Sequence, residues 1–238
     1  MGRSAIFLVA AIAISGVAAA QTTVWVNLEK GDALFLNPST MGWEPLTGKQ
    51  RIPAKTYAIT KHRSRLKVFV RTEVIDAPPA SYFFVTDLFP RDRNQLVEEL
   101  TSIELQQLPS SGRSDTTKPG RTVGLTYGNP DTRGGPDENV AALDERLMAV
   151  GWLEDRASFG PALLCLKRTM TSFPVLYLQP ALTERLCSLY DRLGLYGFLY
   201  EETRRLLETE SEGKMVESLT DWNSLAKVKL TGRQETEK

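Results

Sequence analysis

Few side chains in this sequence could perform metal or nucleophilic chemistry. His62 is the single histidine, and Cys165 and Cys187 are the two cysteines. A zinc site needs several nitrogen or sulfur ligands, and the basic neighbours of His62 would repel a cation. We therefore expect no metal site and no cofactor.

Nucleophilic catalysis would need a cysteine or serine beside a base. A cysteine–histidine pair would have to join His62 to a distant cysteine, and neither cysteine stands in a glycine-bordered loop. The chain has no GxSxG elbow, no phosphate-binding loop and no dinucleotide-binding glycine pattern. We expect a protein without catalytic residues. A wall-degrading hydrolase with paired carboxylates is the enzymatic alternative, but most acidic residues have the spacing of helix-surface charges.

The first 20 residues have the pattern of a secretory signal. A short head with Arg3 precedes an apolar core, and small residues stand before Gln21. The apolar core is shorter than the roughly 20 residues that a membrane-spanning helix needs. We expect cleavage near Ala20, no transmembrane segment in the mature chain, and a periplasmic or extracellular location.

An oxidising location would affect the two cysteines. Cys165 and Cys187 lie on two expected helices, at similar distances from a turn at Pro174. An antiparallel helix pair could bring the sulfur atoms together, and an even number of cysteines outside the cytoplasm favours a disulfide. Two buried free thiols are the alternative.

Residues 22–108 are expected to form a β-rich module with one helix. Apolar and polar residues alternate with period two along short runs that turn clusters separate. Five or six such strands build a small antiparallel sheet or close into an SH3-like barrel. The helical spacing of apolar residues then predicts one helix over residues 90–108.

A basic run lies inside this module. Residues 49–71 contain eight basic side chains and no acidic one. Strand alternation places several on the face opposite the apolar side chains, and the ligand-binding candidates there are Arg63, Arg65, Lys67 and Arg71. Such a patch would attract an anionic polymer or headgroups, whereas a solvated sheet face is the alternative.

The second half of the chain differs in composition. Residues 109–136 are rich in Ser, Thr, Gly and Pro, which predicts a flexible linker. Residues 137–230 have helical periodicity, which predicts an α-helical module, and a charged tail follows over 231–238. The expected fold class is therefore α+β, with two domains.

A sequence pattern occurs twice in the helical module, at residues 140–153 and 186–199. Each copy has apolar residues at helical spacing followed by a glycine, at Gly151 and at Gly197. The pattern predicts amphipathic helices, and glycine takes the left-handed conformation that ends a helix. Such units suit wall binding or partner docking better than catalysis, although unrelated amphipathic helices would give the same pattern.

Residues 140–170 resemble the small peptidoglycan-binding domain often appended to cell-wall hydrolases. The shared features are the first helical stripe, a Gly-Trp-Leu turn at Trp152, and a Phe-Gly-Pro start of the second helix at Phe159. The resemblance implies peptidoglycan as the ligand, with Trp152, Arg156 and Phe159 as ligand-binding candidates. The loop before Phe159 is shorter than usual, and Lys167 stands where the family favours an aliphatic residue. A degenerate domain that keeps the fold and loses the ligand would show the same departures.

Residues 186–208 also resemble one tetratricopeptide unit, which implies a helical hairpin that docks other proteins. The resemblance rests on Leu189, Tyr190, Leu193, Gly194 and Tyr196. The two copies are farther apart than the roughly 34 residues of that repeat.

Together, these patterns predict a non-catalytic, secreted cell-envelope protein that binds peptidoglycan or scaffolds an envelope assembly. The alternative is a helical-repeat docking subunit of a larger complex, ahead of a wall-degrading hydrolase. The expected partner is peptidoglycan or an envelope protein, and nucleic acid is not expected.

Overall fold

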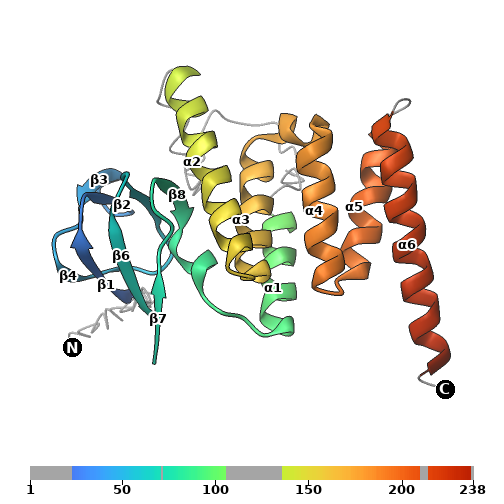
Figure 1. The fold of residues 1–238 in the computed structure, drawn as a ribbon, viewed down its shortest axis with the longest axis horizontal. Helices are drawn as coiled ribbons and strands as arrows, with labels where there is room; N and C mark the ends of the chain where they lie inside the picture. The colour runs from blue at the N-terminus through green and yellow to red at the C-terminus, as the bar shows by residue number, and fades with distance from the viewer. Residues whose placement is uncertain (1–22, 71, 106–135, 210–213, 237–238) are drawn as a thin grey trace, which may run out of the picture.

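The structure is a computed structural model that describes residues 23–70, 72–105, 136–209 and 214–236. In these residues, two antiparallel sheets are followed by six α-helices (Figure 1). The predicted α+β fold class is confirmed. The expected signal over residues 1–20, Arg71 and nearly all of the predicted linker lie outside the described residues.

The β-rich part contains eight short strands where five or six were expected. They are β1 (Thr23–Lys30), β2 (Ala33–Asn37), β3 (Gly42–Pro45), β4 (Lys49–Pro53), β5 (Tyr57–Thr60), β6 (Arg65–Val70), β7 (Glu73–Asp76) and β8 (Ser81–Phe84). Sheet A has the order β4-β1-β6-β7, and sheet B has the order β3-β2-β5-β8. The sheets do not close into a barrel, so the open-sheet alternative describes the fold.

Side-chain alternation decides which face of sheet A is buried. Val24 and Val26 of β1 are buried, whereas Trp25 between them is 41% exposed. Val68 of β6 lies opposite Val26 in register and is also fully buried. Because neighbouring residues in register project to the same side, one face of sheet A joins the core and the other faces solvent.

The helical part begins with the 3-10 turn η1 (Val85–Leu88) and α1 (Arg93–Leu105). It continues with α2 (Pro136–Asp155), α3 (Phe159–Ser172), the 3-10 segment η3 (Pro174–Leu178), α4 (Pro180–Arg192), α5 (Tyr196–Thr209) and α6 (Lys214–Thr236). Figure 1 shows these helices side by side, from α2 next to β8 to α6 at the far end. The last helix runs through most of the predicted charged tail.

The repeated sequence pattern does not produce a repeated structure. Helix α2 continues through Gly151 to Asp155, and Gly197 lies inside the first turn of α5. The left-handed residue after α4 is Gly194, with φ of 64°. The prediction that Gly151 and Gly197 end their helices is wrong, because helical hydrogen bonding tolerates an isolated glycine, and the left-handed residues that follow α2 and α4 are Ala157 and Gly194.

Helices α2 and α3 pack directly against the β-rich part. Helix α2 contacts β8, and α3 contacts both α1 and η1. Buried apolar side chains from the sheets and from all six helices form one continuous cluster. The two predicted modules are therefore in direct contact, and their division into separate domains stays a prediction.

Candidate functional site

The exposed side of sheet A, here called the outer face, carries two rows of side chains that cross all four strands. The first row consists of Arg51, Trp25, Phe69 and Val74, from β4, β1, β6 and β7. The second row consists of Lys49, Asn27, Lys67 and Asp76. The first row is apolar apart from Arg51, and the second is polar. Val74 is 54% exposed, so the apolar row is open to solvent as far as its β7 end.

Two cations of β4 lie over the aromatic rings of the outer face. The Lys49 Nζ is 5.5 Å from the ring centre of Trp25 and 5.4 Å from that of Phe69. The guanidinium carbon of Arg51 is 4.8 Å from the ring centre of Trp25. All three distances are within the range of a cation–π attraction. Neither cation forms an ion pair with a residue that the structure describes.

Lys67, by contrast, has an acidic partner. Its Nζ lies 2.6 Å from a carboxylate oxygen of Glu29, and the hydrogen bond and charge of Glu29 raise the pKa of Lys67. Asp76 also lies opposite Lys67 in register. The uncompensated positive charge of the two rows therefore lies at the β4 edge.

The predicted basic candidates only partly coincide with this site. Arg65 and Lys67 lie on β6 and alternate with buried Leu66 and Val68, as expected. Arg63 lies in the turn before β6 with φ of 65°, and Arg71 lies outside the described residues. Sequence reasoning missed the cations of β4 as a site because the aromatic ring that holds them belongs to β1. The signal that could have found them is Trp25, an aromatic residue between the apolar Val24 and Val26 of an alternating strand.

The helical candidates also have cations over their aromatic rings. The guanidinium carbon of Arg156 lies 3.6 Å from the ring centre of Trp152, and that of Arg192 lies 4.9 Å from the ring centre of Phe159. Trp152 and Phe159 are also packed against the hydrophobic core. Trp152 and Phe159 are therefore partly buried, whereas Trp25 is exposed.

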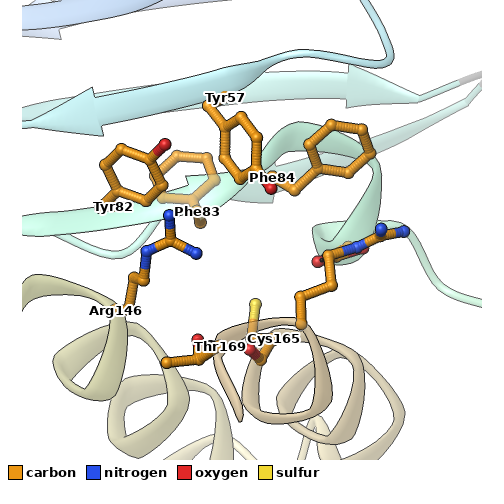
Figure 2. Close-up of a pocket in the computed structure, with 9 residues that line it drawn as sticks. Tyr57, Tyr82, Phe83, Phe84, Arg146, Cys165 and Thr169 are labelled. Atoms are coloured by element: carbon orange, nitrogen blue, oxygen red, sulfur yellow. Dashed lines mark hydrogen bonds and ion pairs between the residues drawn. The ribbon is translucent and has the colours of Figure 1, made fainter. Parts of the chain in front are cut away.

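A narrow cavity lies where sheet B meets α2 and α3. Tyr57, Tyr82, Arg146, Cys165 and Thr169 point toward it in Figure 2. The Arg146 guanidinium carbon lies 4.2 Å from the ring centre of Tyr82, and two further rings lie within 5.4 Å. The cavity volume of about 10 Å³ is room for about one water molecule. This space is too small for a substrate.

Arg168, at the side of the same cavity, joins three elements. Its Nε donates to both carboxylate oxygens of Asp87 in η1, each at 2.9 Å, and its guanidinium also pairs with Glu99 of α1. Burial raises the pKa of Asp87, and the charge of Arg168 opposes that effect. Both groups are therefore engaged in holding α3 against η1 and α1.

The predicted disulfide between Cys165 and Cys187 is absent, and both thiols are free and buried. Cys165 of α3 lines the cavity beside sheet B, whereas Cys187 of α4 lies among acidic groups that include Glu202 of α5. The thiols project into different parts of the core, which is why antiparallel helices do not bring them together. Burial raises the pKa of the Cys165 thiol well above its ordinary value, which makes it a poor nucleophile.

Lys167, which departs from the wall-binding pattern, is fully buried. Its ammonium pairs with Glu202 of α5 and lies 3.4 Å from a carboxylate oxygen of Glu104 of α1. Burial alone would lower the pKa of Lys167, but the charges of Glu202 and its neighbours raise it above its ordinary value. The lysine therefore links three helices.

No three His, Cys, Asp or Glu side chains in the described part of the chain are grouped so that they could hold a metal ion. None of the helices in the same residues is both long and apolar enough to span a membrane. Comparison with protein-family models, with curated proteins and with solved structures finds no match for this chain.

Proposed function

We propose that this protein is a non-catalytic component of the cell envelope that binds peptidoglycan through the outer face of sheet A. The observation that carries the proposal is the exposed Trp25, flanked by the uncompensated cations Lys49 and Arg51. Peptidoglycan combines sugar rings, whose apolar faces pack on aromatic side chains, with carboxylates that attract cations. The expected secretory signal agrees with such a partner.

The contents of the cavity also support a binding role in place of catalysis. The arginines that border it, Arg146 and Arg168, are occupied with aromatic rings and carboxylates of the protein. They hold sheet B and η1 against helices α1, α2 and α3.

A specific observation also favours the second candidate, docking of an envelope protein on the helices. The segment η3 exposes Val175 and Leu178, at 64% and 57%, between α3 and α4. Apolar side chains at such exposure fit a protein contact better than a polar glycan.

Cosedimentation with insoluble peptidoglycan tests the proposal on the mature chain. Trp25→Ala should weaken binding about tenfold, since loss of an anchoring aromatic ring costs more than about 1 kcal/mol. Lys49→Gln/Arg51→Gln should weaken it further. The matched control Lys227→Gln/Lys229→Gln removes the same charge from exposed positions of α6 and should bind as the unchanged protein does.

The pattern of losses separates the two candidates. If Trp25→Ala and Lys49→Gln/Arg51→Gln both sediment like the unchanged protein, the outer face is not the binding site. If binding is lost only in Val175→Asp/Leu178→Asp, the contact belongs to the helices.

A further inference from the structure

Lys49 and Arg51 occupy an edge position that leaves their charges unopposed. They stand two residues apart on β4, an edge strand that pairs only with β1 in sheet A. Their register partners on β1 are Asn27 and Trp25, neither of which carries a charge. Two residues along a strand span about 7 Å, so the two cations border one small area.

One aromatic ring positions both cations. Trp25 lies under the Arg51 guanidinium and under the Lys49 ammonium, and Phe69 lies under the ammonium as well. A guanidinium over a ring still has N–H donors around its rim, and these match the two oxygens of a carboxylate. Cations that the protein already holds in place lose less conformational entropy when a ligand binds.

The acidic residues of the outer face limit the kind of anion that fits. Glu29 pairs with Lys67, and Asp76 lies at the β7 end of the polar row. These carboxylates would repel an extended anionic surface such as a lipid bilayer. They leave the β4 edge open to a single carboxylate.

We propose that Arg51, Lys49 and Trp25 form a subsite for one free carboxylate of the peptide part of peptidoglycan. Arg51 binds both carboxylate oxygens, Lys49 supplies the second positive charge, and Trp25 holds the two cations. Phe69 and Val74 continue the apolar row for about 10 Å beyond Trp25, where the neighbouring sugar packs. The identity of this ligand rests on the proposed function, and the titration with dipeptides tests the subsite separately from binding to whole peptidoglycan.

The indole N–H signal of Trp25 reports directly on the subsite. The chain has four tryptophans, so the signal is assigned in ¹⁵N-labelled protein by its loss in Trp25→Phe. The probes are a muramyl dipeptide with free carboxylates and the same compound with its carboxylates amidated. The acid form should shift the Trp25 signal saturably, and amidation should weaken binding at least about tenfold. Arg51→Gln should weaken binding of the acid dipeptide by the same factor. Arg51→Lys keeps the charge but not the paired N–H donors, so it should weaken binding less.

Each remaining outcome decides between the subsite and the proposed function. Equal shifts with the acid and amidated dipeptides overturn the subsite, even if the protein still sediments with peptidoglycan. A shift of the Trp25 signal with the acid dipeptide alone supports the subsite. If the protein in that case does not sediment with peptidoglycan, the proposed function is wrong and the carboxylate subsite stands. A Trp25 shift with phosphatidylglycerol vesicles, combined with none for the dipeptides, overturns the subsite in favour of a headgroup. Backbone amide spectra of each variant show that it is folded.

Discussion

The Lys167 ammonium of α3 pairs with the Glu202 carboxylate of α5 in a place that solvent barely reaches. The two side chains are 0% and 2% exposed. Arg205, one turn along α5, donates to the other carboxylate oxygen of Glu202. The pair therefore fixes α3 relative to α5 by charge as well as by packing.

Glu202→Gln should lower the free energy of unfolding by about 3–5 kcal/mol, because it removes the compensating charge from a buried ammonium. Urea denaturation followed by circular dichroism measures the change. The matched control is Glu201→Gln, which breaks an exposed pair with Arg204 and should cost far less, because solvent screens the pair. Equal effects of the two substitutions would show that the buried pair contributes no more than a surface pair.

Gly31 should be far less replaceable than Gly48, although both have positive φ. A Cβ at Gly31 would lie 2.7 Å from the Ser64 Oγ and 2.8 Å from the Ser64 Cα, whereas a Cβ at Gly48 would meet nothing within 4 Å. Gly48→Ala should cost the left-handed backbone penalty alone, about 1–2 kcal/mol. Gly31→Ala should cost clearly more in the same denaturation assay, and an equal cost would mean that the β1–β2 turn moves freely away from Ser64.

Much of the fold follows from periodicity in the sequence. Proline suits the first turn of a helix, in agreement with the start of α4 at Pro180, and side-chain alternation agrees with the buried side of β1 and β6. Helix ends were less predictable, because Gly151 fits a helix interior as well as an end. The glycine that takes the left-handed conformation is selected by the contacts of the residues after it. These contacts cannot be read from a short-range sequence pattern.

For the candidate site, the sequence predicts only the kind of surface, an exposed strand face with basic side chains, and not the residues that come together on it. Basic residues on an exposed strand were expected, but the grouping of Lys49 and Arg51 over Trp25 depends on the pairing of β1 with β4. Strand pairing joins residues that are far apart in the chain, and short-range periodicity does not identify the partner strand. The disulfide prediction failed for the same reason, because helix order alone does not say toward which neighbour Cys165 and Cys187 point.

Both thiols should resist labelling in the folded protein. Cys165 and Cys187 are free and buried, and burial raises the pKa of each. Dithionitrobenzoate at pH 8 should react with neither cysteine in the native chain and with both after unfolding in guanidinium without reductant. If neither cysteine reacts in the unfolded, unreduced chain, and the measured mass is two hydrogens below that of the thiol form, the two cysteines are joined in a disulfide.

Stability should fall as the pH rises above about 9. Burial raises the pKa of Cys187 from 9.0 to about 12, so the unfolded chain releases this proton first. The contribution of the protonated Cys187 thiol to the free energy of unfolding is complete below pH 9 and is lost progressively up to about pH 12. The free energy of unfolding falls there by at most about 1.4 kcal/mol per pH unit. Because burial also raises the pKa of Cys165, Cys187→Ala should reduce but not abolish the loss of unfolding free energy between pH 9 and 10, and an unchanged slope there would contradict the raised pKa of Cys187. Burial also raises the pKa of Tyr190, so ionisation of Tyr190 should destabilise both proteins at higher pH.

Binding of the protein to peptidoglycan should weaken as salt rises, because the cations of the outer face are exposed. At physiological ionic strength, charges are screened over about 8 Å, which leaves short contacts at the β4 edge partly effective. Lys49→Glu/Arg51→Glu should remove most of the salt dependence measured by cosedimentation. Arg63→Glu/Arg65→Glu/Lys67→Glu should remove less, although it reverses more charges, because Glu29 already compensates Lys67 and Arg63 lies in a turn. A larger loss in the triple variant than in the double variant would move the binding site from the β4 edge to β6.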